Sequence, residues 1–386
     1  FDLSEIPWDN SPRNIKKLNE TMAYYIIGIP VITSLGIVSA LYLISLDMSP
    51  ILIVQQMLNS MDKFTLLAIP FFIMAGGLME VGGISREIVN FSKKLMGPLP
   101  GGLALVVILA SMMFASMTGA GAATCAAIGS IMLPEMKREG YDESFSSALQ
   151  STAGIFGPII PPSILMVIYA VATDTSVGDM LLAGVIPGIV MGLILIVVTM
   201  RICINRGYKG EGRFSLIEIG KSFVGAFWAL LTPVIILGGI YSGLFTPTEA
   251  AAVATLYSIF IGMFVYKGLT IKKLFYVLFK TMKLASGIML IIAVTQAFGW
   301  ILIREQIPQS LAVFFSSISS SPTVFLFMVV VMLLIVGCFI DAAPACSIFS
   351  PIITPSKDWT SGVLVSDILL IIKGLSRLLQ IFKVSN

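Results

Sequence analysis

The sequence predicts an all-α polytopic membrane protein whose inverted repeats carry two re-entrant hairpins and broken helices. Three observations lead to this class: the composition, the placement of Lys and Arg in the loops, and two similar stretches in the two halves of the chain. Of the 386 residues, 57% are hydrophobic and 12% charged, whereas soluble domains carry about a quarter charged residues. We therefore expect the chain to lie in a lipid bilayer.

The composition also excludes several functions. The chain has no histidine, which excludes Ser-His-Asp and Cys-His catalysis and most zinc sites. Its net charge of +3 is too small, and its basic residues too concentrated in short loops, for nucleic-acid binding. The four cysteines lack metal-type spacing and are expected to be small buried hydrophobes: Cys125, Cys203, Cys338 and Cys346.

Seven apolar stretches approach the length of about 20 residues that a membrane crossing needs. They are 22–46, 64–81, 149–172, 180–204, 223–245, 250–266 and 284–303. Lys and Arg mark cytoplasmic loops, which places the basic loops 201–221 and 267–283 inside. The loops 172–179 and 245–250 contain no Lys or Arg and are predicted to lie outside.

The segment "FASMTGAGAATCAAIGSIMLPEM", residues 114–136, cannot be an ordinary crossing. Arg86, Lys93 and Lys94 precede it and Lys137 and Arg138 follow it, so both flanks are expected in the cytoplasm. The apolar part is too long for one crossing and too short for two. A re-entrant hairpin over residues 102–134, with "TGAGA" as its tip inside the membrane, fits these constraints.

A second interruption follows in "GPIIPPS", residues 157–163, inside a broken helix predicted over 147–172. Its three prolines remove backbone donors and leave carbonyl groups unpaired. Two such interruptions close together favour a binding site over a simple kink. The candidate binding site therefore consists of this break and the hairpin tip, whose free carbonyl and amide groups and Thr118 hydroxyl can bind a ligand.

The stretch that contains residues 71–106 resembles 292–329 in the order of crossing helix, amphipathic arm, proline and apolar run. The charge rule gives the two stretches opposite orientations, so a second hairpin over 323–355 is predicted to enter from outside. Inverted repeats with broken helices are typical of secondary transporters. Asp341, near the second tip, is either an ion-site residue or a helix N-cap, and Glu249 is expected to be a capping carboxylate.

The predicted organisation has six parts. They are a polar segment 1–21, a scaffold helix and linker 22–63, the first repeat's transport part 64–175, scaffold helices 176–281, the second repeat 282–355, and an atypical tail 356–386. Because the chain begins at Phe1 with a polar stretch, we expect it to start inside a longer chain, as a processed product or the downstream part of a fusion.

With these residues in place, the chain resembles the large membrane subunit, of the DctM or SiaM type, of a tripartite ATP-independent periplasmic (TRAP) transporter. The resemblance covers about residues 27–355 and is closest to sialic-acid members. Its specific pieces include "LLAIPFFIMAGGLMEVGGIS", "MTGAGAATCAAIGSIMLPEMKREGYD", "GPIIPPSILMVIYAV", "FTPTEAAAVA" and "FIDAAPACSIFSPIITP".

The resemblance implies sodium-coupled import of an organic acid by an elevator mechanism, in the bacterial inner membrane. Sialic acid is the favoured substrate and a C4-dicarboxylate the next. The implied partners are a small membrane subunit of the SiaQ or DctQ type, either a separate chain or fused upstream, and a periplasmic substrate-binding protein. It further implies one sodium ion at Thr118, Gly119, Gly157, Pro158 and Ser163, and a second at Asp341. Gly121 and Thr124, at the same hairpin tip, complete the eight candidate substrate- or ion-binding residues.

Two departures from the family pattern bear on these expectations. The usual tip reads Ser-Gly-Ser, but here it is Thr118-Gly119-Ala120, so one hydroxyl is absent. The tail 356–386 lacks the proline-containing twin of "GPIIPPS" and is typical of an amphipathic segment at the membrane surface. The alternative function is therefore a channel-like or transport-incompetent scaffold subunit. An intramembrane aspartyl protease is set aside because Asp62, Asp174 and Asp179 lie near span ends.

Overall fold

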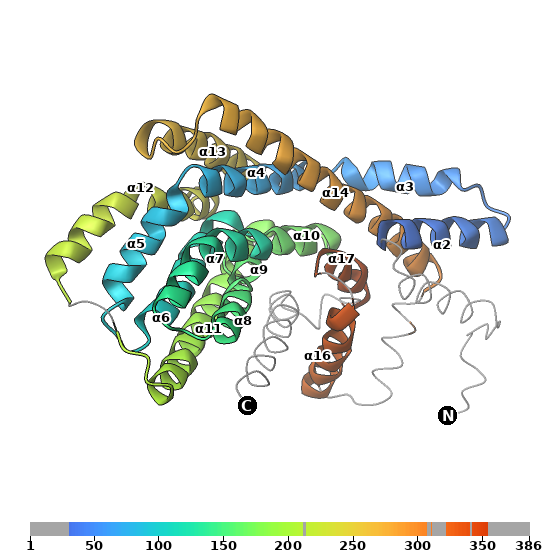
Figure 1. Cartoon of the computed structure of the whole chain (residues 1–386). Helices are drawn as coiled ribbons and strands as arrows, with labels where there is room; N and C mark the ends of the chain where they lie inside the picture. Colours follow the sequence, from blue (N-terminus) through green and yellow to red (C-terminus); the bar gives the residue numbers. More distant parts are fainter. Residues whose placement is uncertain (1–30, 211–213, 307–309, 311–321, 340–341, 354–386) are drawn as a thin grey trace.

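The computed structural model describes residues 31–210, 214–306, 310, 322–339 and 342–353 (Figure 1). Within these ranges the chain forms helices and no strands, which confirms the predicted all-α class. Residues 1–21, Asp341 and the tail 356–386 lie outside the described residues.

Five helical segments are long and apolar enough to cross a membrane, and a sixth span results if the bent pair Glu143–Ile159 and Ile164–Ala172 counts as one. The five are Phe64–Val81, Val177–Asn205, Leu216–Tyr241, Pro247–Val265 and Ile271–Arg304. Each overlaps one of the predicted stretches, because a long apolar run without charges has few alternatives to a spanning helix. Two of them, Leu216–Tyr241 and Ile271–Arg304, begin well before the predicted 223 and 284. The predicted stretch 22–46 is described only from α2 (Val31–Ser45) onward.

One group of helices forms the upper layer in Figure 1. It contains α4 (Ala68–Val81), which follows the short η2 (Phe64–Leu67), with α13 (Pro247–Phe260) and α14 (Ile271–Arg304) packed on it. Thr255 helps to join α13 to α4, since its Oγ1 donates to the carbonyl oxygen of Phe71 at 2.9 Å. At the far end of α14 lie α2 and the short α3 (Ile51–Met61).

A second group of helices contains the first hairpin. Its arms are α6 (Gly102–Thr118) and α7 (Gly121–Arg138), which pack against each other. They are followed by α8 (Glu143–Ala153), α9 (Phe156–Ile159), α10 (Ile164–Ala172) and α11 (Val177–Asn205). The long α11 packs on α6, α9 and α10, so its contacts are with the hairpin group.

The amphipathic arm α5 (Ile84–Met96) joins the two groups. It packs on α6 of the hairpin group and on α12 (Leu216–Tyr241), which in turn packs on α13 of the upper layer. Two adjacent lysines of α5 make ion pairs in opposite directions. Lys93 Nζ lies 2.6 Å from Glu135 on α7, and Lys94 Nζ lies 2.7 Å from Glu218 on α12. The arm is therefore attached to the hairpin on one side and to α12 on the other.

Tyr208, just after α11, holds both ends of the hairpin. Its carbonyl oxygen accepts from Gly101 N at 3.1 Å, and its hydroxyl accepts from Asp142 N at 3.1 Å. The ring stacks on Tyr141 with centroids 4.2 Å apart. Residues 101 and 142 therefore lie on the same side as the basic loop after α11, as a re-entrant hairpin requires. How deeply the hairpin enters a membrane stays a prediction.

The second half contributes α16 (Pro322–Phe339) and α17 (Ala342–Ile353), on either side of the predicted second tip. The helix α17 packs against α14 and α10, and Cys346 Sγ lies 3.8 Å from the carbonyl oxygen of Leu165 on α10. The second predicted hairpin region thus contacts the broken helix of the first half. The inverted relation between the two halves stays a prediction.

Candidate functional site

The first hairpin turns within two residues at its tip. Helix α6 ends at Thr118, Gly119 takes the left-handed conformation with φ 61°, Ala120 is extended, and α7 begins at Gly121. A side chain at Gly119 would be strained by this φ and would also overlap the carbonyl oxygen of Pro162. The break therefore lies where the sequence predicts it, and the tip contacts the interrupted helix directly.

The broken helix is interrupted between α9 and α10. Residues 160–163 separate the two helices, with a cis peptide bond between Pro161 and Pro162. Ser163 begins α10 as its N-cap and also donates its hydroxyl to the carbonyl oxygen of Pro158 at 2.6 Å. That carbonyl would otherwise lack a helical partner, because the residue four positions later is Pro162.

The broken helix differs from the one predicted over 147–172 in two ways. The first helix begins at Glu143, earlier than the predicted 147, because Asp142 caps it by accepting from Phe145 N at 2.8 Å. A further break at Gly154 and Ile155 separates α8 from α9. The sequence did not indicate this early start because residues 143–148, Glu-Ser-Phe-Ser-Ser-Ala, are mostly polar and do not extend the apolar run that begins at Leu149.

The tip and the broken helix pack with backbone against backbone. Ile164 N donates to the carbonyl oxygen of Gly119 at 3.3 Å. A methyl group on Gly157 would lie 2.5 Å from Gly121 N, well inside van der Waals contact. Only glycine at position 157 allows this approach, so the two interruptions form one joint site.

Three hydroxyl groups are fully buried at this site, on Thr118, Thr124 and Ser163. The Oγ1 atoms of Thr118 and Thr124 lie 3.2 Å apart, and Thr124 Oγ1 donates to the carbonyl oxygen of Ala120 at 3.0 Å. The site therefore offers neutral hydroxyl and carbonyl oxygens, which suit a hard monovalent cation.

Four helix ends meet at the same place. The C-termini of α6 and α9 bring partially negative carbonyl groups, and the N-termini of α7 and α10 bring partially positive N–H groups. Carbonyl groups can bind a cation, while helix N-termini favour an anion such as a carboxylate. The arrangement is thus suited to hold a cation and an organic anion close together.

The structure brings together seven of the eight predicted site residues, while Asp341 lies outside the described residues. The contacts above involve Thr118, Gly119, Gly121, Thr124, Gly157, Pro158 and Ser163. Glu249 caps α13 in a capping box with Thr246, as predicted. Sequence reasoning missed Gly76, where a methyl group would lie 3.1 Å from Thr118 Cβ. The feature of the sequence that could have indicated Gly76 is the pair of small residues Gly76-Gly77 within an apolar run.

The fold and this site define a polytopic membrane protein with a helical hairpin against a broken helix, the arrangement of membrane transporters. The family model described as "Tripartite ATP-independent periplasmic transporter, DctM component" matches residues 20–358. The chain belongs to this family, whose members are transporter permease components in the inner membrane. They work with a small membrane subunit and a periplasmic binding protein.

Individual relatives agree with the family assignment. The chain is 41% identical over 329 residues, 85% of its length and 77% of the relative's, to the sialic acid TRAP transporter large permease protein SiaM of Vibrio cholerae. It is 44% identical over 300 residues, 78% and 70% of the two lengths, to the C4-dicarboxylate TRAP transporter large permease protein DctM of Pseudomonas aeruginosa. It is 37% identical over 337 residues, 86% and 53% of the two lengths, to the isethionate TRAP transporter permease protein DctMQ of Oleidesulfovibrio alaskensis.

Proposed function

We propose that this chain is the large membrane subunit of a sodium-coupled importer of an organic acid, which a periplasmic binding protein delivers. The observation that carries the proposal is the joint site, where the tip at Gly119 is hydrogen-bonded to the start of α10. Non-helical backbone at membrane depth is tolerated where it is buried in protein or lines a cavity. Here it is buried, and it carries oxygen ligands for the ion.

Sodium is the proposed coupling ion, held at the joint site by Thr118, Gly119, Gly157, Pro158 and Ser163. Gly121 and Thr124, at the start of α7, lie in the same site. We propose Asp341 for a second ion. Supporting the first assignment, the buried Thr118 and Thr124 hydroxyls lie 3.2 Å apart. A cation there would also attract the substrate carboxylate.

Sialic acid is the favoured substrate and a C4-dicarboxylate the second. Relatives named for each are 41% and 44% identical to the chain, which supports an organic anion as the class. The relative named DctMQ supports a small subunit of the SiaQ or DctQ type as partner. Movement would follow an elevator scheme, in which a transport domain with both hairpins slides against a scaffold.

Uptake into proteoliposomes tests the proposal. The vesicles contain this chain and its small subunit, with the binding protein and radiolabelled sialic acid or C4-dicarboxylate outside. Accumulation above the outside concentration only with an inward sodium gradient and binding protein would support it. Flux that stops at equal concentrations, independent of sodium, would instead indicate the channel-like alternative. No uptake of either acid by folded protein would indicate a transport-incompetent scaffold subunit.

A further inference from the structure

The first thirteen residues of α14 extend beyond the part of this helix that can lie in hydrocarbon. The helix has 34 residues, which at about 1.5 Å each gives about 51 Å, against a hydrocarbon core of about 30 Å. Its apolar part, 284–303, accounts for about 30 Å. The remaining residues, 271–283, therefore lie at the membrane surface, on the side that the charge rule assigns to the cytoplasm.

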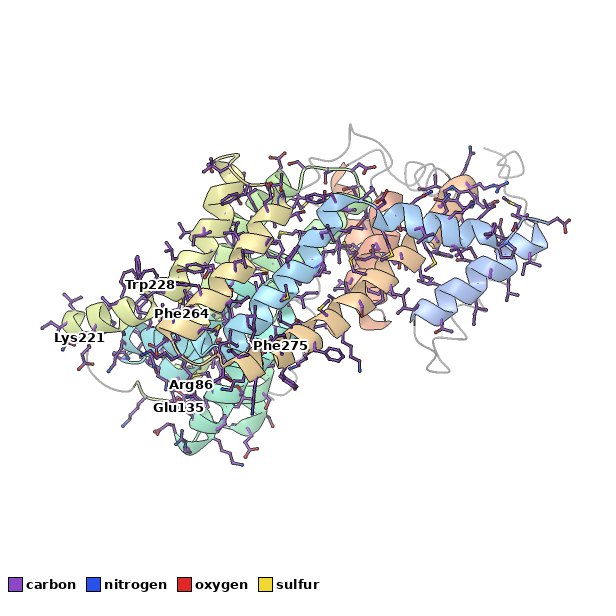
Figure 2. The ribbon with its side chains drawn as sticks, turned by 90° about the horizontal axis from the view of Figure 1, so that it is seen from above. Arg86, Glu135, Lys221, Trp228, Phe264 and Phe275 are labelled. Atoms are coloured by element: carbon purple, nitrogen blue, oxygen red, sulfur yellow. The ribbon has the colours of Figure 1, made fainter. Side chains whose placement is uncertain are left out.

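This surface segment of α14 has three faces at helical spacing. Val277, Thr281 and Ala285 are buried and form the face that packs on the protein. Phe275, Phe279 and Met282 form a second face, with 67%, 77% and 64% of their surfaces exposed. Figure 2 shows Phe275 on the outside of the ribbon. Such large exposed apolar side chains need a non-aqueous environment.

The third face carries Lys272, Lys280 and Lys283, with Tyr276 between them, and all four residues are exposed. The ion pairs of the described residues include none of these lysines. In contrast, Lys63, Lys93, Lys94 and Lys137 each have a carboxylate partner.

The position of the lysines adds to the local positive charge. The first turn of α14 contains no acidic residue, and the N-terminus of a helix is itself the positive end of the macrodipole. Lys272, in this first turn, therefore lies where the macrodipole disfavours a cation, whereas Lys280 and Lys283 lie beyond the turn in which this effect acts. All of α14 is described, and the helix contains no Asp or Glu.

We propose that Lys280 and Lys283, the lysines of α14 nearest its apolar part, bind the phosphate groups of anionic phospholipids, while the exposed Phe279 and Met282 contact the ends of the acyl chains next to these headgroups. A free phosphate ion would match the lysines alone. A lipid matches both faces, since its headgroup and chains lie side by side at the interface. The inference concerns the membrane around the protein and does not depend on the proposed substrate or on sodium.

The test compares two double substitutions that remove the same charge. Lys280→Gln/Lys283→Gln alters the lysine face, and Lys94→Gln/Lys137→Gln alters two lysines that already have carboxylate partners. Each purified protein is titrated in neutral detergent with dioleoyl phosphatidylglycerol or dioleoyl phosphatidylcholine, and bound lipid is measured by native mass spectrometry. At low salt we expect Lys280→Gln/Lys283→Gln to weaken phosphatidylglycerol binding roughly 30-fold, from the usual contribution of a lysine near an anionic membrane.

Lys94→Gln/Lys137→Gln and Lys280→Arg/Lys283→Arg should bind phosphatidylglycerol as the parent does, and phosphatidylcholine binding should be unchanged throughout. Equal phosphatidylglycerol affinity for the parent and Lys280→Gln/Lys283→Gln would overturn the proposal. Displacement of the lipid by inorganic phosphate, but not by sodium chloride of equal ionic strength, would indicate a small-anion site instead. The proposal would also be overturned if an acidic protein co-purified with the parent but not with Lys280→Gln/Lys283→Gln, while both bound phosphatidylglycerol equally.

Discussion

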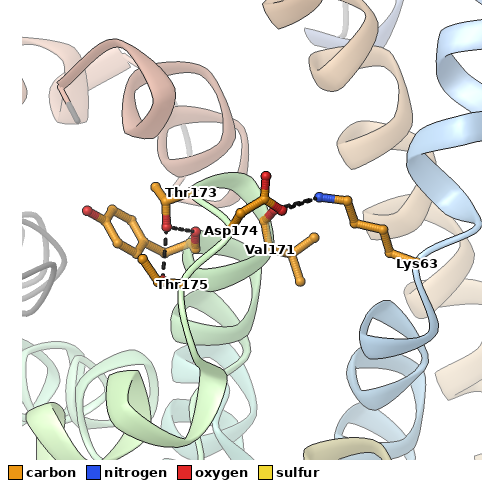
Figure 3. A network of polar contacts seen from close by, with 6 residues as sticks. Lys63, Val171, Thr173, Asp174 and Thr175 are labelled. Atoms are coloured by element: carbon orange, nitrogen blue, oxygen red, sulfur yellow. Dashed lines mark hydrogen bonds and ion pairs between the residues drawn. The ribbon is translucent and has the colours of Figure 1, made fainter. Parts of the chain in front are cut away.

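Lys63 Nζ lies 2.8 Å from Asp174 Oδ1 and 3.1 Å from the carbonyl oxygen of Val171 (Figure 3). The lysine precedes η2 and α4, whereas the aspartate follows α10. The pair therefore joins the two groups of helices, at the start of one span and the end of another. It places residue 63 on the same side of the membrane as loop 172–179. This agrees with the prediction that the spans 64–81 and 149–172 cross the membrane in opposite directions.

The Lys63 and Asp174 pair should contribute little to stability, because 44% and 86% of the two side-chain surfaces are exposed. A double-mutant cycle of Lys63→Met and Asp174→Asn should give a coupling of about 0.2–1 kcal/mol at low salt. High salt should remove most of it. Unfolding midpoints in detergent at two salt concentrations measure the coupling. A larger coupling that persists at high salt would mean that the pair is more buried in solution than in the structure.

Gly157→Ala should disrupt the joint between the hairpin tip and the broken helix. The added methyl group would lie 2.5 Å from Gly121 N, and the backbone must shift to accommodate it. We expect a loss of about 1–3 kcal/mol in stability, as for overpacked cores, and at least a tenfold loss of uptake.

Gly238→Ala is the matched control for Gly157→Ala, because a methyl group on Gly238 in α12 has open space around it. It should be neutral or stabilise the helix by up to about 1 kcal/mol. Thermal unfolding and sodium-dependent uptake are measured for both variants. Similar behaviour of the two would show that the close approach at Gly157 is not needed.

Thr118→Val tests the proposed sodium site while keeping the shape of the side chain. Valine removes the hydroxyl that lies 3.2 Å from Thr124 Oγ1, and Thr118→Ser retains a hydroxyl. We expect Thr118→Val to raise the sodium concentration for half-maximal uptake at least tenfold, equivalent to about 1.4 kcal/mol. Thr118→Ser should stay within about threefold of the parent. An unchanged sodium dependence in Thr118→Val would remove this hydroxyl from the site.

Ser163→Ala should destabilise the broken helix in two ways. It removes the N-cap of α10, which accepts from Met166 N, and the hydroxyl donor to Pro158. We expect a loss of about 1–3 kcal/mol, from a cap and an unsatisfied buried carbonyl. Ser130→Ala, at an exposed site whose hydroxyl bonds within its own helix, is the control and should change the unfolding midpoint little.

Gln150 on α8 should be replaceable by leucine without loss of stability. Its side chain is buried, and neither Oε1 nor Nε2 has a hydrogen-bond partner among the residues that the structure describes. Burial of an unpaired amide costs about 1–3 kcal/mol in proteins. Gln150→Leu should therefore leave the unfolding midpoint unchanged or raise it, and Gln150→Glu should lower it. A marked loss in Gln150→Leu would reveal a partner for the amide in solution.

The helix breaks could be predicted because glycine and proline act locally. "TGAGA" and "GPIIPPS" contain the residues that end helices, and each break lies within its predicted segment. The membrane-spanning helices could be predicted equally well, because their length and apolar character identify them. The contact between the two breaks is a tertiary contact, which local sequence does not specify. From the sequence one could expect only that the two breaks belong to one site.

Other features depend on long-range packing and had no sequence signal. Lys63 and Asp174 are 111 residues apart, and nothing near either residue indicates the other. The helix α3 lies within a region predicted as a linker, because its sequence is short and mixed. The unpaired amide of Gln150 follows from the way α7 and α8 pack, which periodicity does not specify.

The contacts of Tyr208 have a consequence for the order in which the protein is made. Residues 101 and 142, at the two ends of the first hairpin, both bond to a residue that follows the whole of α11. On the ribosome the hairpin arms emerge well before Tyr208. The bonds that tie the hairpin base to Tyr208 can therefore form only after α11 has been synthesised, whereas the direct packing of α6 on α7 can form earlier.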